Sequence, residues 1–373
     1  MVRPGIERDC TMPDISARVV HDLARETGFE LCGIAKPELS PDFGRFQSWV
    51  DRGMAGRMGY LTDHRAEVRA HPAALLPSVR SVICTGSLYG GPKPYSIDFS
   101  DLERGWIARY AFGEDYHQAI RRRMEDLARK LLQIQPFEWR VCVDTAPLLE
   151  RSYARDAGLG WIGRNTCLIS EAHGSWFFLS ELLTSLDLEP HARVADRCGS
   201  CSRCIDACPT AAIVPSPGGG FELDSRLCIS YFTIELRETI PVEVRGAIGN
   251  HVFGCDICQD VCPWNRRRRM TAVPETEPGV SLERMAELTQ TEFREMFRGT
   301  AVSRARYAGF LRNVAIAMGN AGLEKFQTPL ERLAASGDPM VSEHAQWALK
   351  RIQTKLSSSN RSGSGISSNP KSI

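Results

Sequence analysis

The sequence predicts three folded parts: an α/β region over residues 1–185, a cysteine-rich region over 186–270 and an all-α region over 271–356, followed by a disordered tail over 357–373. Three observations lead to this prediction. Strand-like and helical segments alternate in the first part. Eight cysteines gather between Cys198 and Cys262, and the segments after residue 300 have only helical periodicity. At 373 residues the chain is long enough for two or three domains.

The composition is that of an ordinary soluble protein, with 43% hydrophobic and 24% charged residues. No apolar run approaches the roughly 18–20 residues of a membrane span, and the N-terminus has no apolar segment typical of an export signal. Thirteen cysteines without such a signal indicate the reducing cytoplasm, where thiols stay free. A net charge of +1 gives no general attraction to nucleic acid, so such a partner would need a local basic patch.

In the first part, we expect helices where apolar residues recur at helical spacing and strands where the apolar runs are short. The helices are expected at 16–28 with Ser16 as cap, from His117 through Leu131, and from Pro147 to Gly158; the strands are expected at 29–34, 79–89, 139–143, 166–170 and 175–183. Residues 41–70 are expected to form an irregular lid or loop. A glycine-rich stretch over 158–163 matches a dinucleotide loop in spacing, but it follows a helix rather than a strand, so a Rossmann site is rejected.

Asp144 follows the apolar strand at 139–143 and precedes the helix that Pro147 is expected to begin. Ligands bind at such strand ends in open α/β sheets. A carboxylate at this point can equally be no more than the N-cap of the next helix. The residues alone leave both interpretations open.

The cysteines form two runs that each end in proline. Cys198 opens a C-x2-C-x2-C-x3-C-P run that closes at Cys208. Cys255 opens a C-x2-C-x3-C-P run that closes at Cys262, and Cys228 lies between the runs. Eight thiols in this spacing meet the ligand demand of two [4Fe–4S] clusters. Zinc sites use C-x2-C pairs but not such runs, so the spacing predicts a bacterial-type ferredoxin region that moves single electrons.

The two runs also predict which cluster each thiol holds. In this motif the first three cysteines of a run hold one cluster and the fourth reaches the other. Cys228 replaces the missing first cysteine of the second run. The first cluster is therefore assigned to Cys198, Cys201, Cys204 and Cys262, and the second to Cys208, Cys228, Cys255 and Cys258.

The last part begins with four arginines: Arg266, Arg267, Arg268 and Arg269. Between residues 266 and 312 there are ten Arg against six Glu, which suits a phosphate backbone and equally suits a solubilising turn. Helices are expected at 304–320, ending at Gly319-Asn320, and at 327–335 and 340–354. Their apolar faces suit antiparallel pairs stacked as in HEAT repeats. From residue 357 the chain has almost no apolar residues, which predicts disorder.

Several motifs occur together in a fixed order: DYH at 115–117, VDTAPLLER at 143–151, GWIGRNTCLI at 160–169, GSWFFLSELL at 174–183, CGSCSRCIDACPTAAI at 198–213, RLCISYFTIE at 226–235 and GCDICQDVCPWN at 254–265. The ferredoxin motif alone is generic, but the order of the first motifs before the eight cysteines is specific. Over roughly residues 10–355 the chain resembles the epoxyqueuosine reductases, cobalamin-dependent iron–sulfur enzymes of queuosine synthesis in tRNA.

The resemblance implies the fold, the cofactors and the reaction. The first part would be a nitroreductase-like α/β domain that binds cobalamin in place of flavin, and the last part a HEAT-like domain that binds tRNA. Two [4Fe–4S] clusters would pass electrons from an external low-potential donor to cobalt. This oxidoreductase would reduce epoxyqueuosine in the tRNA anticodon loop to queuosine with loss of water. We expect a cytoplasmic monomer without membrane contact.

The resemblance also implies the site residues. Asp144 matches the family's proton donor. The cobalamin-binding positions would be Arg69, Ala108, Asp144, Leu168, Leu179, Ser230, Cys255 and Asp256. From the residues alone, Arg69 is expected on a solvated helix face, and Leu168 and Leu179 in the core. Some members have cysteine where this chain has Ala108, which cannot ligate cobalt. Partial burial would raise the pKa of Asp144 toward neutrality, so that the carboxyl carries a proton.

Two other functions are compatible with parts of the sequence. One is a cobalamin-dependent reductase or dehalogenase of a small molecule, and the HEAT-like part with its arginines argues against it. The other is an electron-transfer or RNA-binding scaffold. The extensive region before residue 185 argues against a scaffold, because an electron carrier needs no such pocket.

Overall fold

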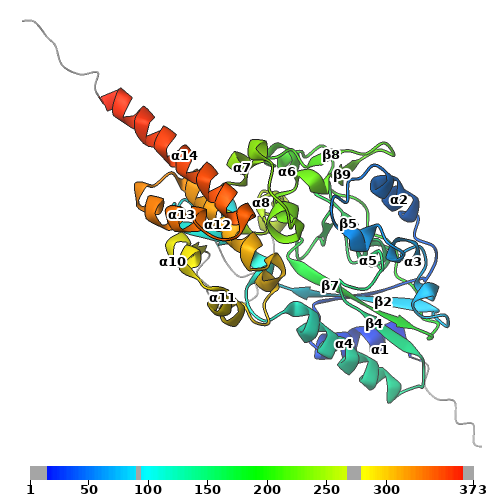
Figure 1. Ribbon diagram of the computed structural model, residues 1–373. Coiled ribbons are helices and arrows are strands. Elements are labelled where there is room, and N and C mark those ends of the chain that lie inside the picture. Colours follow the sequence, from blue (N-terminus) through cyan, green and yellow to red (C-terminus); the bar gives the residue numbers. More distant parts are fainter. Residues whose placement is uncertain (1–14, 90–93, 267–278, 364–373) are drawn as a thin grey trace, which may run out of the picture.

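The computed structural model describes residues 15–89, 94–266 and 279–363. Figure 1 shows the sheet of the first part on one side of the molecule and the C-terminal helices on the other, with the short helices of the cysteine-rich region beside both. Within the described residues, no helix combines the length and apolar character needed to cross a bilayer.

A four-stranded sheet forms the centre of the first part. Its strands lie in the order β1 (Leu31–Ala35), β2 (Ser81–Leu88), β7 (Phe177–Thr184) and β4 (Trp139–Cys142). Every neighbouring pair is antiparallel. Helices and strands are mixed as predicted, but the expected ligand-binding edge of an open, parallel sheet is wrong for this region, because such an edge requires parallel strands.

Helices cover both faces of this sheet, with α1 (Ala17–Glu26) and α4 (Tyr116–Leu132) on one side and α5 (Glu150–Asp156) on the other (Figure 1). Successive strand residues point to opposite faces. Ile83 and Leu182 therefore join the core with α1 and α4, whereas Val82 and Leu183 join the core with α5. Burial of each such side chain contributes about 1.5–3 kcal/mol.

A second sheet takes one strand from each predicted part of the chain. β3 (Arg104–Ile107) lies in the middle, parallel to β10 (His251–Phe253) and antiparallel to β11 (Gly279–Ser281). Phe253 of this sheet shares a core with Phe310 and Val314 of the C-terminal helices. The sheet therefore spans the boundaries expected at residues 185 and 270 and ties the three parts together.

Short elements dominate the cysteine-rich region. They are α6 (Arg203–Asp206), the hairpin of β8 (Ile213–Pro215) and β9 (Phe221–Leu223), a π-helix (Tyr231–Glu235), α7 (Val242–Ile248), α8 (Ile257–Asp260) and α9 (Pro263–Arg266). A second hairpin, β5 (Trp161–Ile162) with β6 (Leu168–Ile169), precedes them in the chain.

The last part is helical, as predicted. Its helices are α10 (Leu282–Glu287), α11 (Gln290–Met296), α12 (Tyr307–Ala321), α13 (Gln327–Ala334) and α14 (Pro339–Gly363). The end expected for α12 at Gly319-Asn320 is wrong: Gly319 packs against α14, where an added Cβ would lie 2.8 Å from Ala348, and Gly322 in the left-handed conformation ends the helix. α14 continues past residue 357, so the predicted tail begins inside a helix; residues 364–373 lie outside the described part.

Three further expectations need correction. Residues 41–70 are not all irregular, because they contain α2 (Phe43–Asp51) and α3 (Arg65–Val68). α5 begins at Glu150 rather than at Pro147, because the chain turns over residues 144–149. Arg312 belongs to no basic surface: it is fully buried and donates to the backbone carbonyls of Phe232, Leu236 and Glu238.

Candidate functional site

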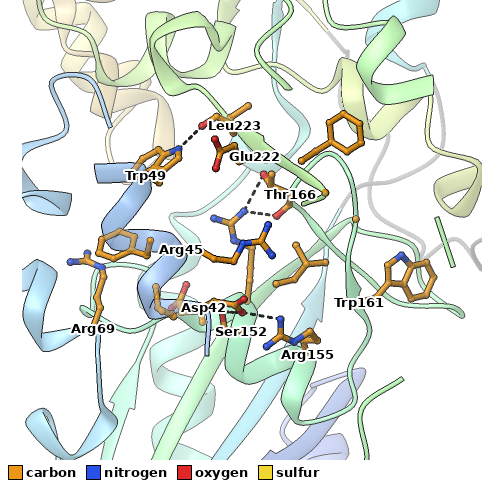
Figure 2. Close-up of a pocket in the computed structure, with 18 of the residues that line it drawn as sticks. Asp42, Arg45, Trp49, Arg69, Ser152, Arg155, Trp161, Thr166, Glu222 and Leu223 are labelled. Carbon is orange, nitrogen blue, oxygen red and sulfur yellow. Dashed lines mark hydrogen bonds and ion pairs between the residues drawn. The ribbon is translucent and has the colours of Figure 1, made fainter. Parts of the chain in front are cut away.

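A cavity of about 830 Å³ opens between α2, the turn after β4, the start of α5 and the β8–β9 hairpin (Figure 2). Its size is typical of a site for a large ligand. Trp49 of α2 closes one side, where its indole N–H donates to the Leu223 carbonyl at 2.6 Å. Asp144 and Arg69 also line the cavity, so two of the predicted cofactor-binding residues lie on its wall.

The cavity wall is rich in arginine. Five guanidinium groups line it: Arg45, Arg69, Arg151, Arg155 and Arg164. Figure 2 shows Arg155 held beside Asp42, with a 2.8 Å ion pair between them. Arg69 is buried and donates to the carbonyls of Tyr60 and Arg65, so its expected position on a solvated helix face is wrong.

Two buried donors on this wall have no hydrogen-bond acceptor among the described residues. They are the indole N–H of Trp161 and the Nη2 of Arg155. A buried donor without an acceptor costs about 1–3 kcal/mol. Their positions fit a ligand that brings its own acceptors, such as the amide and phosphate groups of a cobalamin.

At one end of the cavity, three side chains form a hydrogen-bonded row. Asp115 caps α4 by accepting from the backbone N–H of His117. The Asp115 carboxylate also lies 2.6 Å from Nδ1 of His117, and Nε2 of His117 lies 2.8 Å from Oδ2 of Asp144. Asp144 has a φ of 50°, a left-handed conformation that Asp and Asn tolerate better than most residues. The turn after β4 and the start of α4 together place this row.

The row sets the protonation of Asp144. Burial opposes the charge on Asp144, but the hydrogen bond and charge of His117, with Arg304 and Tyr116, outweigh it and lower the pKa of the carboxyl. Burial likewise opposes the His117 cation, but its hydrogen bonds to Asp144 and Asp115 raise the pKa of the imidazole. The expected rise in the pKa of Asp144 is therefore wrong: the pair holds one proton, and it lies mainly on His117.

Arg304 reaches this row from the C-terminal part, and sequence reasoning did not single it out. Its guanidinium lies 2.8 Å from Glu235 and 3.9 Å from Oδ2 of Asp144, and it also donates to the Tyr60 hydroxyl. Arg304 appeared in the sequence only as one of ten arginines. No local pattern indicates which of them contacts a residue far away in the chain.

Aromatic rings pack around the row. Tyr116 stacks on His117 with ring centroids 4.1 Å apart and on Phe178 at 4.0 Å. Burial and the charge of Asp144 raise the pKa of Tyr116, so its hydroxyl stays neutral and can donate. The rings limit the water around His117, whose side chain is 26% exposed.

Thiols of the cysteine-rich region lie close enough together to shift one another's pKa values. Cys262 and Cys198 pack in one cluster of side chains, and the charges of both add to burial in raising the pKa of Cys204 to about 11. Burial, together with the charges of Cys228 and Cys208, likewise raises the pKa of Cys255. The charge of Cys201 also raises the pKa of Cys204, and the charge of Cys228 raises the pKa of Cys258.

All twelve cysteines of the described residues are free thiols. No three His, Cys, Asp or Glu side chains among these residues lie close enough to hold a single metal ion. A four-iron cluster differs from such a site, because each thiolate binds a separate iron. Cys167, which sequence reasoning passed over, lies within hydrogen-bond reach of Cys258.

The remaining predicted cofactor residues lie away from the cavity wall. Leu168 is buried and Leu179 is half-buried, both in one core, as the residues alone suggested. Ala108 is buried against Gly254, where an added Cβ would lie 2.5 Å away. Ser230 precedes the π-helix. Asp256 is buried and accepts from the Trp106 indole and the Arg109 backbone, so its carboxylate faces the protein interior.

Of the predicted tRNA-binding arginines, Arg266 is exposed at the end of α9. Arg267, Arg268 and Arg269 lie outside the described residues. The exposure of Arg266 is compatible with both interpretations of the arginine run.

Two family models match the chain. Residues 197–265 match a 4Fe-4S double cluster binding domain, and residues 69–145 match epoxyqueuosine reductase QueG, DUF1730. The first match spans all eight assigned cysteines. The second spans Arg69, Ala108 and the row from Asp115 to Asp144.

Curated and solved proteins resemble the chain over most of its length. An epoxyqueuosine reductase of Pseudomonas aeruginosa is 42% identical over 347 residues, covering 90% of this chain and 94% of that protein. One of Xanthomonas campestris is 40% identical, covering 90% and 96%. A crystal structure of epoxyqueuosine reductase with an epoxyqueuosine-modified tRNA stem loop has a TM-score of 0.81 at 26% identity, covering 94% of each chain.

Proposed function

The chain belongs to the epoxyqueuosine reductase family, and from that premise we propose that it reduces epoxyqueuosine in a tRNA anticodon loop to queuosine, with release of water. The observation that carries this proposal is the row of Asp115, His117 and Asp144 at the end of an arginine-lined cavity. Opening an epoxide leaves an oxygen that must take a proton, and this row holds one.

The double cluster domain supplies single electrons. We assign the clusters as the spacing indicates, and the closeness of the thiols to one another supports this assignment. Cobalamin would lie in the cavity with Arg69 and Asp144 beside it, and the free donors of Trp161 and Arg155 fit its acceptors. When bound, cobalamin supplies the low-potential reduction of the epoxide carbon.

The protein's own residues hold and move the proton. Asp115 orients His117 by binding Nδ1, so that Nε2–H points at Asp144. As the epoxide C–O bond breaks, the proton of His117 passes to Asp144, which gives it to the oxygen. Arg304 keeps the carboxylate in place between turnovers. The stacked rings of Tyr116 and Phe178 exclude water from one side of the row.

The other parts of the chain would serve the substrate and the electron supply. We assign cobalamin binding to the first part in a nitroreductase-like domain, and tRNA binding to the HEAT-like helices and the Arg266–Arg269 run. The tRNA backbone carries the charge that these arginines suit, and the base would be splayed into the site. An external low-potential donor would reduce the clusters of a cytoplasmic monomer.

The test is an anaerobic assay of the whole protein reconstituted with iron, sulfide and cobalamin. Epoxyqueuosine-modified tRNA and a strong reductant are added, and digested nucleosides are analysed by mass spectrometry. Conversion to queuosine that requires cobalamin is expected, with absorption and EPR spectra of about eight irons per chain. Full loading of both cofactors without queuosine would reject the proposed substrate.

A further inference from the structure

Two carboxyl side chains lie behind the Asp144 turn, and the mechanism above does not use them. Glu150 is the first residue of α5, and its side chain lines the cavity together with Asp144. Glu181 lies on β7 in the middle of the four-stranded sheet, fully buried between Cys84 of β2 and Cys142 of β4. α5 covers this face of the sheet, so the two acids lie between the cavity and the core.

Glu150 holds the backbone of Asp144. The Asp144 N–H donates to Oε1 of Glu150 at 2.6 Å. Asp144 is in the left-handed conformation, which costs free energy and requires contacts that fix it. The Glu150 carboxyl is the contact that the structure provides for this N–H, so it fixes the direction in which Asp144 points.

Burial favours the protonated form of both acids. Burial and then the charge of Asp144 raise the pKa of Glu150 to about 8. Burial and then the charge of Glu150 raise the pKa of Glu181 well above its usual value. Among the described residues, no cation or backbone N–H pairs with either oxygen of Glu181. A carboxylate without such partners would not remain charged in this position.

The other charged or titratable groups around the pair do not supply a strong counter-ion. Arg151, next to Glu150 in α5, donates to the carbonyl of Thr166 instead. Several groups interact electrostatically with Glu150 or Glu181. They are Asp144, Arg151, Arg69, Tyr116, Cys84 and Cys142. Of these groups, Asp144 donates its backbone N–H to Glu150 and is the group that needs a proton.

The reaction needs more protons than the row holds. Removing the epoxide oxygen as water breaks two C–O bonds and consumes two electrons and two protons. The oxygen leaves with both C–O bonding pairs, so the two electrons from the external reductant become the pair of the new C=C bond. The His117–Asp144 pair holds one proton. A second acid must deliver the other before water can leave.

We propose that Glu150, backed by Glu181, is a positioning residue for Asp144 that also stores the second proton and returns it to the Asp144–His117 pair. The first proton goes from His117 through Asp144 to the epoxide oxygen as the first C–O bond breaks. The second goes from Glu150 through Asp144 to the resulting hydroxyl, which leaves as water when the second C–O bond breaks. Glu150 then regains a proton from the solvent of the cavity. This inference rests on the proposed function.

Glu150→Gln separates the two roles of Glu150. The amide oxygen still accepts from the Asp144 N–H, so the turn is kept, but the side chain has no acidic proton. We expect kcat to fall at least about tenfold with little change in KM. The fall in wild-type kcat as the pH rises through about 8 should disappear, because this limb reports the deprotonation of Glu150. Wild-type kcat and an unchanged limb in Glu150→Gln would overturn the proposal.

Glu125→Gln, which changes a half-buried acid on α4, is the matched control and should behave as wild type. A second measurement does not depend on turnover. A carboxyl with a folded pKa raised from 4.5 to about 8 destabilises the fold as the pH rises through that window, since the folded state binds the extra proton. The Tm of the wild type should therefore fall between pH 6 and pH 9 more than that of Glu150→Gln. Equal slopes would contradict the buried neutral acid, whereas a wild type that makes no queuosine would reject the proposed function itself.

Discussion

The cysteine-rich region and the Asp144 row are built from the chain in opposite ways. Seven of the eight assigned thiols lie within two short runs whose spacing fixes their relative positions. The Asp144 row instead joins α4, the turn after β4 and a 3-10 turn near Arg304, which lie far apart in sequence. Groups placed by local spacing can be recognised from a motif, whereas groups placed by packing can be recognised only after the chain has folded. The predictions below test this difference.

The largest effect is expected in the cysteine-rich region. Cys258→Ser should remove one cluster, lowering the iron from about eight to about four per chain, because a four-iron cluster needs all its thiolates. Turnover should be lost. Cys32→Ser, a thiol of β1 outside this region, should keep all the iron. Iron analysis and EPR measure the cluster content of both variants. Full iron content in Cys258→Ser would show that Cys258 is not a cluster ligand.

Asp144→Asn should cause the next largest loss of activity. Asn tolerates the same left-handed backbone, so the fold, the iron and the cobalamin should be retained. Without the acid, kcat should fall about 10²–10⁴-fold. Asp126→Asn on the exposed side of α4 serves as the control. Normal queuosine formation by Asp144→Asn would show that the proton comes from elsewhere.

Arg304→Gln tests the long-range part of the row and should have an intermediate effect. Loss of the guanidinium removes a charge that lowers the pKa of Asp144, so that pKa should rise, and kcat should fall by about tenfold or less. Carboxyl NMR and steady-state kinetics measure the two. Arg306→Gln changes an exposed arginine two residues away and should leave both unchanged. An unaltered Asp144 pKa in Arg304→Gln would mean that Arg304 does not act on the row.

The smallest effect is expected outside both regions. Changing Arg266, Arg267, Arg268 and Arg269 to Ser should weaken tRNA binding by about tenfold at low salt and flatten its salt dependence, because fewer counterions are released. kcat at saturating tRNA should not change. Binding curves at several salt concentrations test this. Identical curves would make the run a solubilising turn.

The accuracy of the sequence-based site predictions follows the same division. Asp144 and Arg69 lie on the cavity wall as the family motifs implied, but the expected pKa of Asp144 was wrong because it depends on His117 and Arg304. DYH was noticed as a motif, yet nothing in it indicated that His117 contacts Asp144. Asp256 stays a predicted cobalamin-binding position, and its carboxylate accepts from the Trp106 indole N–H.

The sequence by itself determined the local features of this protein: the helices with their caps, the strands of the first sheet, and the two cysteine runs. Each depends on residues a few positions apart, so periodicity and spacing suffice to predict it. Only the tertiary structure decided the antiparallel order of the sheet, the burial of Arg312, the contact of Arg304 with Asp144 and the placement of Glu150 and Glu181 behind the Asp144 turn. These depend on burial and charge between distant segments, which no local pattern contains.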